Sequence, residues 1–287
     1  MDKDLKLIKK KYLSIIQELK KNNKLYYEKS DPKISDLEYD KLKKEILDLE
    51  NEYKFLKSKD SPSNSVGFKP SKFFFKHKHR IKMLSLSNAF NKKDLVNFEK
   101  KISNFLNLKE NNNIEYSVEP KIDGISASLT YKNSNLVLGL SRGDGIEGEI
   151  ITENLKTIRD IPKKINHKSF PKDIDIRGEV YIGKKDFEKI QDRFANPRNA
   201  ASGSLRQKNP NETKKIPLRF IAYTYGFIDA TNIKKQSEFL SLLKKWGFNT
   251  NNYNAVISNV DNLVENHKEF EKKRYDLDFD VDGLVYK

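Results

Sequence analysis

The chain of 287 residues contains no cysteine, which excludes disulfide bonds and any cysteine-ligated zinc site within it. The absence of cysteine is consistent with a reducing compartment. The N-terminal segment MDKDLKLIKKKY has no apolar run behind its charges, so it is not a secretory signal, and no stretch approaches transmembrane length. We therefore expect a soluble, cytoplasmic protein that makes no membrane contact.

Arginine is also scarce, since only nine of the 56 basic residues are arginine. The net charge of +15 favours polyanionic partners, nucleic acid before a membrane surface, although coding bias toward lysine and asparagine would raise the charge as well. Where lysine is the default cation, an arginine suggests a need for its planar, bidentate fork. Four of the nine lie in glycine- and asparagine-containing segments: Arg142, Arg177, Arg198 and Arg206.

The length of the chain, with 36% hydrophobic residues, is long for one domain and comfortable for two. Residues 4–53 carry apolar side chains three and four positions apart, as amphipathic helices do, with a break at Pro32. A segment rich in turn formers, residues 58–65, follows. We therefore predict a small helical domain over residues 1–66 and a second domain over residues 67–287.

Beyond this linker, short β-like runs alternate with turns and with helical patterns. The mixture lacks regular βαβ alternation, which predicts an α+β fold with mixed, largely antiparallel sheets and flanking helices. The polar segment 194–207 is predicted to be a loop. The predicted strands are 116–118, 126–131, 136–140, 175–182 and 219–225, and the predicted helices are 92–106, 184–193, 237–246 and 260–275.

The segment Glu119-Pro120-Lys121-Ile122-Asp123-Gly124 places a lysine at a predicted strand end, between two carboxylates. A solvated lysine in a surface hairpin is one interpretation, because matches as short as K-x-D-G are common by chance. The other is a nucleophilic amine, which must lose its proton; burial, neighbouring cations or a bound metal would make that easier. We expect Gly124 to supply the backbone freedom that the turn needs.

Four further segments accompany this one in order and favour the nucleophile. The first segment, residues 141–145, resembles a backbone-exposing loop for phosphate or ribose, and the second, residues 175–181, places a carboxylate beside a glycine in a strand. The third segment, residues 194–207, is densely polar. The fourth segment, residues 281–287, repeats Asp-Gly before a strand and ends on a lysine.

Taken together, these segments resemble the ordered motifs of the covalent nucleotidyltransferases, in particular the bacterial NAD-dependent DNA ligases. The resemblance covers nearly the whole chain, and its most specific parts are segment 194–207 and the helix start Asp36-Leu37-Glu38-Tyr39-Asp40. The helical region with Tyr26 and Tyr27 resembles the small N-terminal domain of the NAD-using branch. The resemblance implies that residues 1–66 bind the nicotinamide mononucleotide half of NAD and that residues 67–287 form an adenylation domain.

The resemblance implies a reaction in which Lys121 attacks the adenylyl phosphorus of NAD and expels nicotinamide mononucleotide. AMP then passes to the 5′-phosphate of a nick in double-stranded DNA, and the 3′-hydroxyl seals it, in DNA replication and repair. Magnesium (or manganese) would neutralise the phosphates. Its ligands cannot be read from the sequence, although Glu179 and Asp123 are plausible neighbours. We expect a monomer.

The resemblance also implies which residues contact the nucleotide. Glu119 and Arg142 match adenylate-contacting positions, and Glu179 matches a carboxylate on the ribose or metal side. Ser85 and Leu86 match a segment on the adenosine side, and Tyr223 is the candidate for stacking on adenine. Arg198 and Arg206 are expected at phosphates of the cofactor or of DNA, and Lys287 matches a lysine that contacts the nucleotide phosphate. Plainer interpretations exist: Glu179 as an ion-pair partner of Arg177, the serine–leucine pair and the tyrosine as core residues, the loop arginines as solvated side chains.

The nicotinamide end of NAD is cationic, so carboxylates attract it and aromatic rings can stack on it. Asp36 and Asp40 lie four positions apart, on one face of a helix. Acids at a helix N-terminus are also favoured by the macrodipole, which explains Asp36 but not the whole set. The residues expected at this end of NAD are Tyr26, Tyr27, Asp36, Leu37, Glu38, Tyr39 and Asp40.

Members of the family that this chain resembles continue after the adenylation domain with further modules, including a lysine motif, an oligonucleotide-binding barrel and a zinc site. We therefore expect the chain to be truncated or a fragment ending within the adenylation domain, to seal nicks very poorly and to adenylylate itself weakly. One alternative is an ATP-dependent ligase, an RNA ligase or a capping enzyme, distinguished by labelling with ATP rather than NAD. The other is a basic, non-catalytic DNA-binding module, which would bind DNA in a salt-sensitive way without forming an adenylate.

Overall fold

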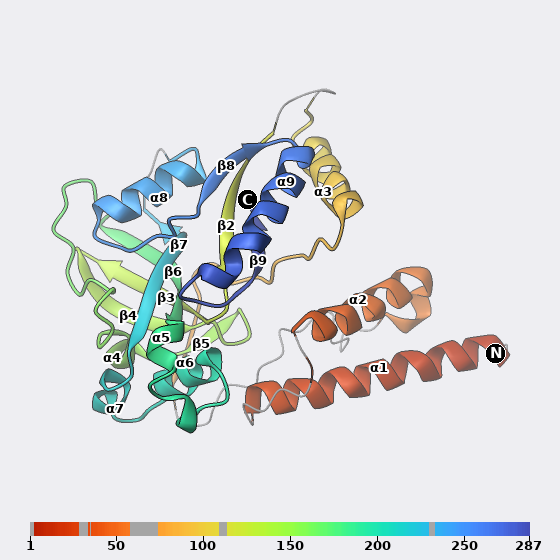
Figure 1. Cartoon of the computed structure of the whole chain (residues 1–287), viewed down its shortest axis with the longest axis horizontal. Helices are drawn as coiled ribbons and strands as arrows, with labels where there is room; N and C mark the ends of the chain where they lie inside the picture. Colours follow the sequence, from red (N-terminus) through yellow and green to blue (C-terminus); the bar gives the residue numbers. More distant parts are fainter. Residues whose placement is uncertain (1–2, 29–33, 35, 58–73, 109–113, 230–232) are drawn as a thin grey trace.

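The computed structural model describes residues 3–28, 34, 36–57, 74–108, 114–229 and 233–287. A pair of long helices is followed by β-sheets with flanking helices (Figure 1). Within the described ranges, none of the helices is both long and apolar enough to span a bilayer.

The first two helices are α1 (Lys3–Glu28) and α2 (Asp36–Glu52), followed by a 3₁₀ turn, η1 (Lys54–Leu56). Their apolar positions recur every three or four residues, so each helix buries one face, and Figure 1 shows the two lying side by side. Tyr12 donates a hydrogen bond of 2.7 Å to the buried Glu50. The buried apolar residues of this pair are Tyr12, Ile15, Ile16, Leu19, Ile46 and Leu56.

The strands of the described residues form three sheets, in the orders β4-β3-β6-β7, β8-β2-β9 and β1-β5. Every pairing within them is antiparallel, which confirms the α+β prediction. Their bounds are β1 (Lys76–Lys78), β2 (Glu115–Ile122), β3 (Ile125–Lys132), β4 (Asn135–Ser141), β5 (Glu147–Glu149), β6 (Asp173–Ile182), β7 (Leu218–Ile228), β8 (Ala255–Ser258) and β9 (Val281–Tyr286).

Helices cover both larger sheets. α3 (Lys92–Phe105) and α9 (Val260–Lys273) pack on the three-stranded sheet, and α8 (Gln236–Lys245) packs on β7 of the four-stranded sheet (Figure 1). The predicted helices at these positions are confirmed within a few residues. Shorter elements are α4 (Thr152–Leu155), α5 (Lys184–Phe187), η3 (Gln191–Arg193), α6 (Pro197–Leu205), α7 (Pro210–Lys214) and η4 (Arg274–Asp276).

Two local predictions were wrong. Segment 194–207 is not a loop, because α6 occupies most of it: the Asn196 side chain accepts a hydrogen bond from the Asn199 N–H at 2.7 Å, and Pro197 takes the first helical position. Segment 184–193 is not one helix, because Ile190 leaves the helical region (φ −132°, ψ 8°) and separates α5 from η3.

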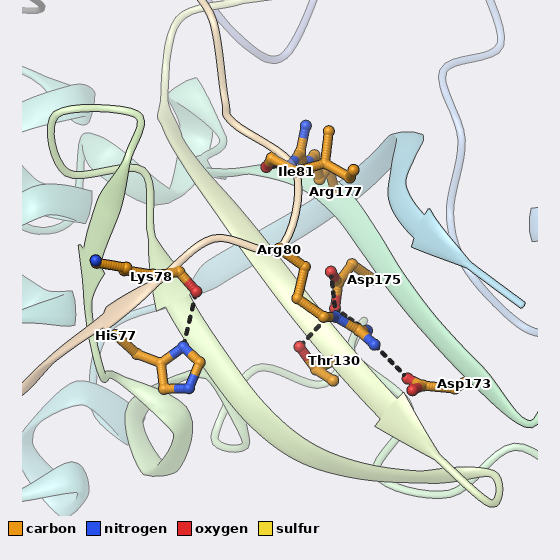
Figure 2. Close-up of polar contacts among 8 residues, drawn as sticks. All are labelled: His77, Lys78, Arg80, Ile81, Thr130, Asp173, Asp175 and Arg177. Carbon is orange, nitrogen blue, oxygen red and sulfur yellow. Dashed lines mark hydrogen bonds and ion pairs between the residues drawn. The ribbon is translucent and has the colours of Figure 1, made fainter.

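An irregular segment, residues 79–85, lies on the face of the four-stranded sheet, and we call it the strap. Arg80 donates from Nε (2.9 Å) and Nη2 (2.5 Å) to Asp175 on β6, and from Nη1 to Asp173 at 2.8 Å (Figure 2). Thr130 on β3 donates to the same Asp175 carboxylate at 2.6 Å. The Arg80 guanidinium also lies 4.2 Å from the ring centroid of Phe227. A bidentate pair with a carboxylate only 3% exposed therefore holds the strap on the sheet.

A second arginine of β6 holds the next part of the strap. Arg177 lies two positions from Asp175 and so projects from the same face of the strand. Its Nη2 donates to the carbonyl oxygen of Ile81, and both residues are drawn in Figure 2. Its Nη1 donates to the carbonyl oxygen of Lys82 at 3.3 Å. The strap is thus held by side chains of the sheet together with two backbone hydrogen bonds of 2.9 Å, from the N–H groups of His79 and Met83 to the carbonyl oxygens of Ile146 and Gly145.

We expect Arg80→Met to lower the free energy of unfolding by about 3 kcal/mol, because it leaves the buried Asp175 carboxylate without its counter-ion. Urea denaturation followed by the fluorescence of Trp246, the single tryptophan, which is buried in the core of the four-stranded sheet, measures this. Arg219→Met is the matched control, since its pair with Asp160 involves a half-exposed arginine and is expected to contribute about 1 kcal/mol or less. Equal losses in the two variants would contradict the assignment.

Candidate active site

Lys121 lies where the two larger sheets meet. It is the second-last residue of β2, opposite Gly283 of β9, and the chain then passes through Asp123 and Gly124 into β3 of the other sheet. Gly124 does not adopt a positive φ, so the backbone freedom expected of it is not a left-handed conformation. A Cβ at this position would lie 2.4 Å from the Val180 carbonyl oxygen, so glycine is required by the close approach of two backbones.

The Lys121 ammonium group donates a short hydrogen bond to the carboxylate of Asp282 on β9. Burial lowers the pKa of Lys121, but the charge and the hydrogen bond of Asp282 outweigh burial and the weaker effect of Arg198, so the pKa is raised overall. Burial and the nearby cation therefore act in the direction expected from the sequence, but Asp282 outweighs them, so the ammonium form of Lys121 is favoured in this arrangement. Asp282 was missed as a site residue, although the repeated Asp-Gly pattern at 282–283 was the signal that could have identified it.

Two further carboxylates surround Lys121. Glu179 of β6 is half-buried and accepts a hydrogen bond of 2.8 Å from Ser126, and burial raises its pKa to about 7. Burial also raises the pKa of Asp123, against the opposing charge of Arg198, whose Nη1 donates to Asp123 at 2.6 Å. The alternative in which Glu179 pairs with Arg177 is wrong, because Arg177 bonds the strap instead.

A second group of predicted residues meets around Glu119, whose side chain is buried. Its Oε2 accepts from Lys287 Nζ at 2.7 Å, and its Oε1 accepts from Gln236 Nε2 at 2.8 Å and from Ser117 Oγ at 3.2 Å. Lys287 Nζ also lies 5.2 Å from the ring centroid of Tyr223. Burial lowers the pKa of Lys287, although the Glu119 charge opposes the shift. We call Glu119, Tyr223 and Lys287 the Glu119 corner.

Arg142 meets the strap. Its Nη2 donates to Ser85 Oγ at 2.9 Å, and the turn that follows it uses positive φ at Gly143 (58°) and Gly145 (88°), where side chains are strained. Ser85 and Leu86 are exposed, so the alternative in which they form a core strand is wrong. The structure therefore brings together two of the predicted adenosine-side positions, Ser85 and Arg142.

The two arginines of segment 194–207 have different partners. Arg198, on α6, joins the Lys121 group through Asp123. Arg206, at the end of α6, donates from Nε to Glu149 at 3.1 Å, and that carboxylate is fully buried. The solvated alternative is wrong for both arginines. A phosphate contact by either of them remains a prediction.

Most residues of the predicted nicotinamide site have side chains outside the part of the chain that the structure describes. Tyr26 and Tyr27 are in the last turn of α1, and Asp36, Leu37 and Asp40 are in the first turns of α2, but their side chains are not among the described residues. Glu38 is exposed, and Tyr39 is partly buried against the core of the helix pair. The grouping of these seven residues remains a prediction.

Comparisons with known proteins agree along the whole chain. Residues 71–287 match the family described as NAD-dependent DNA ligase adenylation domain, and residues 6–67 match the DNA ligase-like, N-terminal NAD+-binding domain. A protein named DNA ligase from Pelagibacter ubique is 63% identical over 286 residues, covering 100% of this chain and 42% of the relative. The DNA ligase of Parvibaculum lavamentivorans is 45% identical, over 94% of this chain and 39% of that protein. The DNA ligase of Clostridioides difficile is 41% identical, over 98% of this chain and 42% of that protein. The chain thus spans about two-fifths of their length.

Replacing Asp282 by Asn should lower the pKa of Lys121, because burial and Arg198 would then act without the opposing carboxylate. We expect Lys121 to react with acetic anhydride at lower pH in D282N than in the wild type, measured by mass spectrometry of its peptide across a pH series. Asp186→Asn is the control, because Asp186 also forms an ion pair with a lysine, Lys189, and that pair does not involve Lys121. An unchanged titration of Lys121 in D282N would show that Asp282 does not control it.

Proposed function

Because the chain belongs to the family of NAD-dependent DNA ligases, we propose that it forms a covalent adenylate on Lys121 with NAD as the donor. The Nζ–P bond forms as the P–O bond to nicotinamide mononucleotide breaks. The observation that carries the proposal is the position of Lys121, where the ends of strands from two sheets surround it with Asp282, Glu179 and the Asp123–Arg198 pair. A solvated surface hairpin would not bring four charged groups around one lysine.

The ammonium group must lose its proton before Lys121 can attack. Asp282 already accepts its hydrogen bond, so this carboxylate is the first acceptor of the proton. The pKa of Glu179, raised to about 7 by burial, suits it to exchange a proton near neutral pH. An anionic donor phosphate beside Arg198 would draw that guanidinium away from Asp123 and rearrange the charges around the amine.

The remaining predicted residues are assigned to the two ends of NAD. The Glu119 corner and the Arg142–Ser85 contact are assigned to the adenosine, with Leu86 beside them, and Arg198 and Arg206 to the phosphates. We assign residues 1–66 to the nicotinamide end and residues 67–287 to adenylation. The separate hydrophobic core of the α1–α2 pair supports this division.

Magnesium or manganese would assist the reaction. Among the described residues, no group of three histidine, aspartate or glutamate side chains is placed to hold a metal ion. Mg²⁺ needs no such cage, since it is commonly held by one or two carboxylates together with substrate phosphates and water, and Glu179 and Asp123 are the carboxylates that fit. When bound, the ion would neutralise charge on the donor phosphates.

The activity proposed for the whole protein is nick sealing. AMP would pass from Lys121 to a 5′-phosphate in double-stranded DNA, and the adjacent 3′-hydroxyl would displace it. The net charge of +15 supports contacts with the phosphate backbone.

Incubation with NAD and magnesium should add one adenylyl group to the chain, detected by intact mass spectrometry. We expect no addition in Lys121→Ala and a normal addition in Lys132→Ala, an exposed lysine at the far end of β3. ATP should not replace NAD. An adduct that survives in K121A, or one formed from ATP alone, would contradict the proposal; DNA binding without any adduct would favour a non-catalytic module.

Glu179→Gln should lower the rate of adenylylation by about tenfold or more near pH 8, where the carboxylate, with a pKa of about 7, is ionised. Below about pH 6 the wild-type side chain is itself neutral, so the difference should become small. Single-turnover rates across pH measure this. A ratio of rates that does not change with pH would show that ionised Glu179 is not needed.

A further inference from the structure

Gln236 had no part in the sequence-based prediction, yet it joins the two larger sheets at the Glu119 corner. It is the first residue of α8, and its side-chain nitrogen lies 2.8 Å from Glu119 Oε1 and 2.6 Å from the Tyr223 carbonyl oxygen. A primary amide has two N–H donors, so one hydrogen serves each acceptor. Glu119 belongs to β2 and Tyr223 to β7, in different sheets.

The carboxylate that Gln236 contacts needs its hydrogen bonds. Glu119 is only 4% exposed, and a buried charge is tolerated only when it is paired and hydrogen-bonded. Lys287 donates to one oxygen, while Gln236 and Ser117 donate to the other. Of these donors, Lys287 lies on a long, flexible side chain, and Ser117 bonds at the longer distance of 3.2 Å. Gln236 is therefore the donor best placed to fix the orientation of the carboxylate.

The backbone that carries Gln236 is itself fixed. The Glu238 carboxylate accepts from the N–H groups of Lys234 and Lys235 at 3.1 and 3.4 Å, which anchors the start of α8. Phe239 and Leu243 of the same helix are fully buried in the large core. The amide thus reaches Glu119 from a rigid element.

We propose that Gln236 is a positioning residue for nucleotide binding: its amide holds the Glu119 carboxylate and the Tyr223 backbone in the arrangement that receives the adenylate. The inference rests on the proposed function, in which Glu119 contacts the adenylate. Because an amide does not ionise, Gln236 donates both hydrogen bonds at every physiological pH. A carboxyl group of the same shape would face two acceptors and could donate only when protonated.

The test uses Gln236→Glu, Gln236→Met and the control Gln191→Glu, which places the same new charge on an exposed glutamine of the same domain. Dissociation constants for NAD and for AMP are measured by calorimetry from about pH 5.5 to about pH 8.5. At high pH we expect both Gln236 variants to bind about tenfold or more weakly than the wild type. As the pH falls, the deficit of Q236E should shrink because the introduced carboxyl group takes up a proton, whereas the deficit of Q236M should stay constant.

Three other results would overturn the inference. Binding by both Gln236 variants within about twofold of the wild type at all pH values would show that the amide positions nothing. A deficit that does not change with pH in either variant would point to a merely structural contribution. Trp246 fluorescence shows whether each variant is folded. If one variant folds poorly, the change of binding with pH in the other, folded variant still tests the inference. If the wild type binds neither NAD nor AMP and gains no adenylate, the proposed function fails first and this inference with it.

Discussion

The close approach of two backbones at Gly124 is the constraint on which the candidate site depends. No side chain fits there, because the carbonyl of Val180 occupies the space. The chain can therefore leave one sheet after Ile122 and enter the other at Ile125. As a result, the ends of β2, β9 and β6 converge, and groups more than 150 residues apart in sequence, such as Lys121 and Asp282, come into contact.

The charges gathered at this convergence oppose one another. Asp282 stabilises the ammonium form of Lys121, while burial and Arg198 act against it. Burial raises the pKa values of Asp123 and Glu179, which surround the same lysine. In the resting state the proposed nucleophile, Lys121, is therefore held as an ammonium group by Asp282, the same carboxylate that is proposed to accept its proton. A change in the position of one charge is expected to alter the protonation of its neighbours, because these groups interact electrostatically with one another.

The sequence predicted what depends on local pattern. The two N-terminal helices, the strands around Lys121 and the helices on the sheets follow from periodicity and turn residues. Three-residue strands such as β1 and β5 are too short to show a period, and the glycine and serine content of α6 concealed a helix whose cap and first-turn proline were both present in the sequence. Motif order identified Lys121 and Glu119 as candidates, but it could not identify Gln236, because Gln236 lies 117 positions from Glu119 and the sequence carries no signal of their contact.

The position of β9 has a consequence for the order in which the protein folds. This strand supplies Asp282 near one end, and the residue that follows it is Lys287, which reaches Glu119 across 168 positions of sequence. Pairing over such a separation must close a long loop before its contacts form, and non-local contacts of this kind slow folding. During synthesis, the four-stranded sheet can assemble before residue 281 has emerged, whereas the surroundings of Lys121 cannot. The lysine therefore acquires the Asp282 carboxylate only when β9 pairs with β2, which makes its chemical environment depend on a strand that is distant in sequence.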